Sequence, residues 1–157
     1  MIIRLTSSHG FTLIEILVVV AIVAILAVVV YPSYTYQIMK TRRSDAKIAL
    51  TELAGLQENH YVNGSPPAYT ASFATLLNLD SGETDKYGFK LQSSVLLLSK
   101  DGHYEITFPQ GENNNLSRNF TLEAKPVATG PQADDTDCQW FRIDATGEKT
   151  ALKDDCW

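Results

Sequence analysis

The feature that most constrains this chain is an apolar stretch close to its N-terminus. From Phe11 to Val30 only Thr12 and Glu15 are polar. About 20 apolar residues in a helix are enough to cross the hydrocarbon core of a bilayer. Beyond Tyr36 the sequence has the mixed composition of a water-soluble domain. We therefore expect a membrane-spanning segment that is followed by a globular part.

The order of these segments differs from that of an ordinary secretory signal peptide. Such a signal has a basic start, an apolar stretch of about 7–15 residues and a small-residue cleavage site after it. Here a polar leader, residues 1–10, carries Arg4 and precedes the apolar run. By the positive-inside tendency Arg4 holds the leader in the cytoplasm and places the later domain outside. A plain single-pass anchor with a short cytoplasmic tail also has this pattern.

Glu15 argues against a plain anchor. A carboxylate in the hydrocarbon core costs several kcal/mol unless it is paired, and such residues usually have a function. Cleavage between Gly10 and Phe11 would create a new α-amino group on Phe11. Because Phe11 and Glu15 are four residues apart, they lie on nearby faces of one helix. The amine and the carboxylate could then neutralise each other, within one subunit or between neighbours.

Residues 10–15, Gly-Phe-Thr-Leu-Ile-Glu, resemble the prepilin motif of type IV pilins and pseudopilins, with the same short leader before it and long apolar run after it. The resemblance implies that an aspartyl prepilin peptidase of the inner membrane removes residues 1–10 by cutting after Gly10. It implies that Phe11 is then N-methylated, and that Glu15 pairs with the Phe11 amine of a neighbouring subunit. The chain is thus expected to be a substrate of this chemistry, not an enzyme, and no cofactor is expected.

The helix is expected to continue beyond the membrane. Pro32 lacks a backbone donor and should kink the helix without ending it, and breakers at residues 63–67 should end it. By resemblance, Pro32 matches the helix-kinking proline of pilins, whose long helix is embedded in a globular head. Apolar residues follow near helical spacing between Ser44 and Tyr61 and should pack on that head. These are Ala46, Ala49, Leu50, Leu53, Leu56 and Tyr61.

The remaining sequence predicts an α+β fold with a small antiparallel sheet. Residues 68 to about 100 are interpreted as a connecting region with a short helix at Phe73–Leu77, and Asp101-Gly102 and Thr146-Gly147 as turns. We expect three to five strands against the helix. The candidates are Tyr87–Leu98, which is weak, Tyr104–Phe108, Phe120–Ala124 and Trp140–Asp144. The expected domains are the leader 1–10, the transmembrane and assembly segment 11–36, and the head 37–157.

The cysteines are Cys138 and Cys156. In a domain outside the cytoplasm a disulfide is favoured over two free buried thiols. Closing a loop of this size would stabilise the fold by roughly 3 kcal/mol. By resemblance, this loop is the D-region of pilins. The segments around Phe120–Pro126 and Thr146–Lys149, with Trp157 at the end, are similar to PilE-type minor pilins of Gram-negative bacteria.

The resemblance favours a minor pilin that primes a type IV pilus or is incorporated into it, with adhesion, twitching motility and DNA uptake as outcomes of the whole system. The alternatives are a major pilin, a DNA-binding competence pilin and a type II secretion pseudopilin. The implied partners are the prepilin peptidase, other major and minor pilins, the inner-membrane assembly platform and a tip adhesin. The implied location is the inner membrane, with the head in the periplasm, and then the extracellular pilus.

The charge pattern disfavours nucleic acid as a partner. The formal net charge is −5, whereas binding to phosphates needs a basic surface. The loop between the cysteines is also slightly acidic. It contains Arg142, Lys149 and Lys153 against Asp144, Glu148, Asp154 and Asp155.

Other patterns carry less weight. The three histidines, at positions 9, 60 and 103, are scattered and belong to no catalytic or metal-binding motif. The acidic run Asp134–Asp137 is interpreted as a solvated loop in preference to a calcium site, so no metal is expected. Arg42 and Arg43 are interpreted as a solvated face of the helix, with salt bridges between subunits as the alternative.

Overall fold

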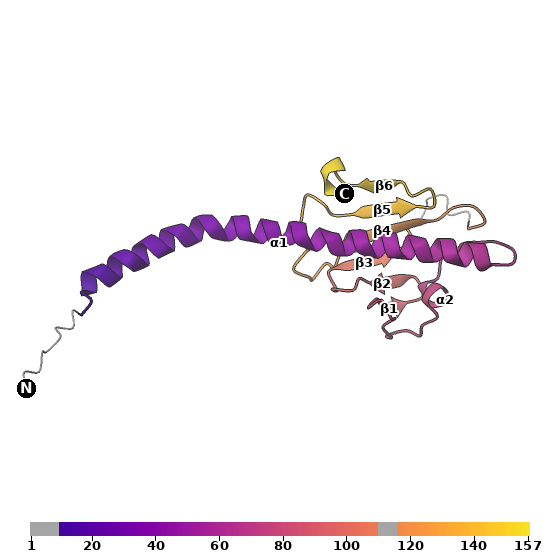
Figure 1. Ribbon diagram of the computed structural model, residues 1–157, viewed down its shortest axis with the longest axis horizontal. Coiled ribbons are helices and arrows are strands. Elements are labelled where there is room, and N and C mark those ends of the chain that lie inside the picture. Colours follow the sequence, from indigo (N-terminus) through magenta and orange to yellow (C-terminus); the bar gives the residue numbers. More distant parts are fainter. Residues whose placement is uncertain (1–9, 110–115) are drawn as a thin grey trace, which may run out of the picture. The chain divides into compact units, whose positions relative to one another are not determined.

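A computed structural model describes residues 10–109 and 116–157. They fall into two compact units, one ending at Ile38 and one running from Met39 to Trp157, which we call the head. The helix α1 (Leu13–Asn63) runs through both units (Figure 1). It begins after Thr12 and ends where Gly64 and two prolines follow, so the predicted breakers do end it.

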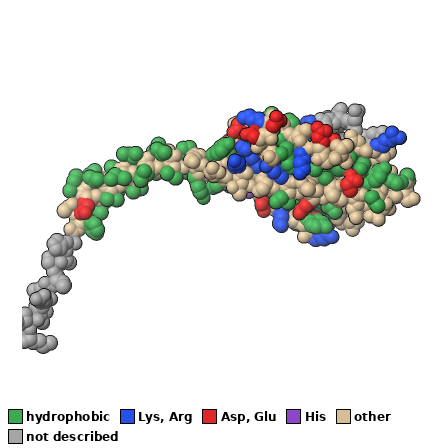
Figure 2. Space-filling model, turned by 45° about the horizontal axis from the view of Figure 1, so that its top comes forward, with side chains coloured by type: hydrophobic (Ala, Val, Ile, Leu, Met, Phe, Trp, Pro, Cys, Tyr) green, Lys and Arg blue, Asp and Glu red, His purple; other side chains and the backbone are tan. Residues whose placement is uncertain are grey.

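The first unit consists of the apolar part of α1. Its large hydrophobic side chains are 48–82% exposed from Phe11 to Val30, and Figure 2 shows them along the helix. By length and composition, α1 is able to cross a membrane. Pro32 lies inside α1, so the helix continues through the proline as predicted.

The head contains a six-stranded antiparallel sheet in which each strand pairs with the next along the chain (Figure 1). Two short helices, α2 (Phe73–Leu77) and the 3-10 helix η1 (Asp154–Cys156), lie outside the sheet. The α+β class is confirmed. The strands are β1 (Lys90–Ser93), β2 (Leu96–Leu98), β3 (Tyr104–Thr107), β4 (Thr121–Pro126), β5 (Phe141–Asp144) and β6 (Lys149–Ala151).

The core of the head lies between α1 and one face of the sheet. Strands β3 and β5 alternate between buried and half-buried residues, which is the pattern of a sheet with one packed face. The helix contributes Ala46, Ala49, Leu50 and Leu53, and the sheet contributes Leu91, Leu97, Tyr104, Ile106, Leu122, Ala124, Phe141 and Ile143.

The expectation of three to five strands was wrong, because the described residues alone form six. The region interpreted as a connection contains the hairpin of β1 and β2, whose register shifts between Leu91 and Ser93. This bulge breaks the strict alternation that marks a strand in a sequence. Strand β6 is only three residues long and has no buried residue. Its pairing with β5, not its own pattern, makes it a strand.

Candidate functional site

The predicted processing junction lies at the start of α1. Gly10 and Phe11 are exposed and precede the helix. A side chain at position 10 would meet no atom within 4 Å. Thr12 occupies the N-cap position: its carbonyl accepts a hydrogen bond from the Ile16 amide, and its hydroxyl accepts one from the Glu15 amide, both at 3.3 Å.

This cap gives Glu15 a local role. Thr12 and Glu15 are three residues apart, the spacing of a capping box, in which the first residue caps the helix and the acid lies in its first turn. The positive end of the helix dipole favours a carboxylate at that position. The sequence pattern had indicated only an assembly role for Glu15, and the capping of the same turn by Thr12 was not predicted. The Thr-x-x-Glu spacing was the available signal.

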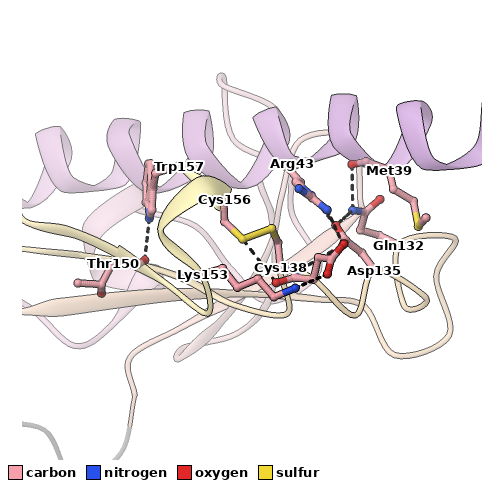
Figure 3. Close-up of a disulfide and its surroundings, with 10 residues drawn as sticks. Met39, Arg43, Gln132, Asp135, Cys138, Thr150, Lys153, Cys156 and Trp157 are labelled. Atoms are coloured by element: carbon pink, nitrogen blue, oxygen red, sulfur yellow. Dashed lines mark hydrogen bonds and ion pairs between the residues drawn. A yellow bond between two sulfur atoms is a disulfide. The ribbon is translucent and has the colours of Figure 1, made fainter.

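At the other end of the chain Cys138 and Cys156 form a disulfide, with their Cα atoms 5.7 Å apart (Figure 3). It joins the segment before β5 to the helix η1. The indole of Trp157, the next residue, donates a hydrogen bond of 2.7 Å to the Thr150 carbonyl on β6. The disulfide and this hydrogen bond hold the C-terminus against the edge of the sheet.

The acidic run before Cys138 is solvated only in part, because Asp134 is exposed and Asp137 half-buried, whereas Asp135 is buried. Asp135 is only 2% exposed and forms two hydrogen bonds of 2.8 Å with the guanidinium of Arg43 on α1 (Figure 3). Arg43 is 4% exposed, so its assignment to a solvated face was wrong. A bidentate, charge-assisted pair of this kind satisfies both buried charges. It attaches the segment just before the disulfide-bounded loop to the helix.

Further contacts extend this attachment. The side-chain amide of Gln132 donates to the Met39 carbonyl and to Asp135, and Arg42 donates to the Pro131 carbonyl. The hydroxyl of Ser99 donates to the buried Asp45 at 2.6 Å. Burial raises the pKa of Tyr104, and the charge of Asp135 adds to this effect.

Two cations of the disulfide-bounded loop, residues 138–156, lie over aromatic rings. The Arg142 guanidinium is 4.8 Å from the centre of the Trp140 ring, and the Lys149 ammonium is 5.1 Å from that of Trp157. Arg142 also forms an ion pair of 2.7 Å with Glu123, which is 3% exposed. A cationic side chain and an aromatic ring therefore lie side by side in each of the two pairs, Arg142–Trp140 and Lys149–Trp157.

The acids of this region have partners of their own. Lys153 pairs with Asp137 and, by donating a hydrogen bond, lowers the pKa of that carboxyl. Asp144 accepts from the amides of Thr146 and Glu148 in the β5–β6 turn. In the described parts of the chain, no group of three or more His, Cys, Asp or Glu side chains is placed to hold a metal ion.

Two family models match the chain. Residues 5–31 match the family model for the prokaryotic N-terminal methylation motif. Residues 32–142 match the family model described as type IV minor pilin ComP, DNA uptake sequence receptor. A search of curated proteins found no match. The two matched segments adjoin and together cover the apolar helix and most of the head.

Proposed function

Since this chain belongs to the family of ComP type IV minor pilins, we propose that it is cut after Gly10, methylated on Phe11 and inserted into a pilus through α1. Before assembly the apolar helix anchors it in a membrane. The observation that carries the proposal is the exposed apolar surface formed by Phe11 and the first part of α1. In water such a surface is very unfavourable, so lipid or other subunits must cover it.

The proposed role of Glu15 is to pair with the Phe11 amine of a neighbouring subunit. The acid is exposed in the first turn of α1, where a neighbour can reach it. The partners on this proposal are the prepilin peptidase, other major and minor pilins, an inner-membrane assembly platform and a tip adhesin, in a Gram-negative cell. The disulfide-bounded region is proposed to face outward from the filament.

Processing is tested by mass spectrometry of the chain purified from cells that carry a prepilin peptidase. We expect residues 1–10 to be absent and the new N-terminus to carry one methyl group. Gly10→Val should block the cut, because a branched side chain replaces the hydrogen at the junction, whereas Ser8→Ala should be processed normally. Recovery of the parent chain with its leader attached would refute the proposal.

Assembly is tested separately with Glu15→Ala. This variant should lose its leader as the parent does, yet be depleted from sheared pili relative to the membrane fraction. Glu15→Asp keeps the charge and should restore part of the incorporation. Normal incorporation of Glu15→Ala would show that the carboxylate has no role in assembly.

A second function is favoured by the description of the family, which names a DNA uptake sequence receptor. We infer that the head binds DNA. The cation–aromatic pairs Arg142–Trp140 and Lys149–Trp157 support this inference, because cations bind phosphates and rings pack on sugars and bases. The net charge of −5 opposes it, so binding should depend on a local patch.

The test uses the full mature chain in detergent micelles with a labelled DNA duplex, measured by fluorescence anisotropy over a series of salt concentrations. Lys149→Gln should weaken binding and lower the slope of log K against log salt by about 1. Lys86→Gln is the matched control, since Lys86 also lies over a ring, that of Tyr87, but far from the disulfide in sequence. Equal affinities of the two variants, or no binding at physiological salt, would refute this function.

A further inference from the structure

Three tyrosines follow the apolar run within six residues of α1. Tyr31, Tyr34 and Tyr36 are 71%, 63% and 45% exposed. They are three of the seven tyrosines of the chain. The head core does not contain them. An amphipathic ring has an apolar body and a polar hydroxyl, and it is most stable where hydrocarbon meets water.

We propose that this tyrosine cluster, Tyr31, Tyr34 and Tyr36, binds the phospholipid headgroup layer on the outer side of the membrane and thereby fixes the depth of α1 before assembly. The proposal rests on the proposed function, because it requires the chain to be membrane-anchored. The cluster is continuous with the helix segment that is apolar enough to span a membrane. This continuity identifies the headgroup layer as the occupant of the tyrosine surface.

The dimensions of the helix agree with this placement. At about 1.5 Å per residue, the helix from Leu13 to Tyr31 is about 27 Å long. Phe11 and Thr12 precede it, so the whole apolar run comes close to the roughly 30 Å of a typical hydrocarbon core. The rise from Tyr31 to Tyr36 is about 7.5 Å. One headgroup layer is roughly 5–7 Å thick. The cluster therefore spans one such layer when the apolar run spans the core.

Pro32 supports the same boundary. Its nitrogen cannot donate to the carbonyl four residues earlier, that of Val28. The Val28 carbonyl lies within about 5 Å of the Tyr31 level, and an unsatisfied carbonyl costs less close to the boundary than in the middle of the hydrocarbon core. The Thr35 hydroxyl donates a hydrogen bond of 2.9 Å to the Pro32 carbonyl, which adds a polar group at this level. A proline between Tyr31 and Tyr34 thus fits the wet boundary better than the core.

This depth has a consequence for Glu15. The acid lies about 24 Å along the helix from Tyr31, hence about 6 Å inside the opposite boundary, and Phe11 lies at that boundary. The processing junction is then within reach of water and of a peptidase. Moving the helix outward by one turn would draw Glu15 deeper into hydrocarbon, where a charge needs a partner. The tyrosines would hold the helix at the depth that avoids this.

The test maps the membrane boundary in the full chain, reconstituted in phosphatidylethanolamine–phosphatidylglycerol vesicles with the head outside. Single cysteines are introduced at Val29, Val30, Ser33 or Gln37 and treated with a membrane-impermeant maleimide. The native disulfide does not react. We expect protection at Val29 and Val30 and labelling at Ser33 and Gln37.

The boundary should move by two residues or more, about 3 Å, when Tyr31→Ala and Tyr34→Ala are combined. Tyr31→Trp with Tyr34→Trp should keep it, because indole also prefers the interface. Ile22→Ala with Val23→Ala, within the apolar run, is the matched control and should not move it. A boundary that is the same in the alanine pair, or that lies beyond Gln37 in the parent, would overturn the proposal.

Two outcomes separate this proposal from the proposed function. If the alanine pair keeps the parent boundary but is depleted from pili, the tyrosines act in subunit contacts and the lipid proposal is wrong. If the parent chain is released from vesicles by alkaline carbonate, the helix does not span the membrane, and the membrane-anchored function itself fails.

Discussion

Arg43 and Asp135 are 92 positions apart in the sequence and form a bidentate ion pair inside the head, with Nε–Oδ2 and Nη2–Oδ1 distances of 2.8 Å. Asp135 also accepts hydrogen bonds from the amide of Cys138 and the side chain of Gln132. The carboxylate therefore connects α1 to the start of the disulfide-bounded loop. Burial of both charges makes the pair sensitive to the loss of either partner.

Asp135→Asn should destabilise the head by about 3–5 kcal/mol, because it removes the charged group that forms the bidentate ion pair with the buried Arg43 guanidinium. Asp134→Asn, at an exposed neighbouring position, should change the free energy of unfolding very little. Urea unfolding of the full chain in micelles, followed by tryptophan fluorescence, measures both. Replacing the pair with Arg43→Met and Asp135→Leu should recover much of the loss. Equal stability of the two Asn variants would contradict the proposed importance of the pair.

Removing the disulfide with Cys138→Ser and Cys156→Ser should lower stability by roughly 3 kcal/mol, because the unfolded chain regains the freedom of a loop of this length. The segment from Lys149 to Trp157 should lose protection first, since the cross-link holds η1 beside β6. Hydrogen exchange measured by mass spectrometry, with the reduced parent as a second sample, checks this order. Unchanged exchange in that segment would mean that the Trp157 contacts alone retain it.

Thr12→Ala should loosen the first turn of α1, because the Glu15 amide loses the hydroxyl that accepts its hydrogen bond. The expected cost is about 1 kcal/mol, the usual value for an N-cap. Thr12→Ser keeps the hydroxyl and should behave as the parent does. NMR amide exchange at Glu15 and Ile16 in bicelles reports the opening of this turn. Equal exchange in the Ala and Ser variants would rule out a capping role.

Alkaline pH should destabilise the head through Tyr69. Its ring stacks on Tyr61 and its hydroxyl donates to Glu58 at 2.9 Å. Burial, with a smaller effect of Glu58, raises the pKa of Tyr69 to about 12. The folded state therefore holds a proton that the unfolded chain loses near its ordinary value of about 10. Stability is unaffected below that value and falls as pH rises toward 12, by on the order of 2–3 kcal/mol.

Tyr69→Phe has no proton to lose and should show a shallower decline between pH 9 and pH 12. It should also be less stable at neutral pH, because the Glu58 hydrogen bond is absent. Burial also raises the pKa of Tyr104. This residue is present in the parent and in Tyr69→Phe, so it accounts for a fall of stability with pH that the two proteins share. Urea midpoints across this pH range give the comparison. Parallel declines would show that Tyr69 is not responsible.

Part of the fold followed directly from sequence patterns. The apolar run, the breakers after Asn63 and the alternating strands at Tyr104 and Phe141 are local signals, and each corresponds to an element of the structure. Strand β6 and the β1–β2 hairpin were not predicted as such. A short strand has too few residues for a period to be visible, and a bulge changes the period where it occurs.

The charged residues of the head show a different limit. In the sequence, Arg43 lies in a helical segment and Asp135 in an acidic run. The residues next to each of them do not indicate that the two form a pair. Both were interpreted as solvated from their sequence neighbours, and this interpretation was wrong. Burial depends on residues that the fold brings together from distant parts of the chain. Glu123 is buried as well, and it forms ion pairs with Lys125 and Arg142.

The sequence by itself determined that this chain has an apolar helix with one acid in its first turn after a Gly-Phe junction, because those properties depend on neighbours along the chain. Tertiary structure decided how the disulfide-bounded loop and the segment before it are held. Arg43 on α1 donates hydrogen bonds to Asp135, and Gln132 donates one to the Met39 carbonyl. Trp157 donates one to the Thr150 carbonyl on β6. No local sequence pattern predicts these pairs. Pairing of distant buried charges is a property of the packed head, and only the packed head reveals it.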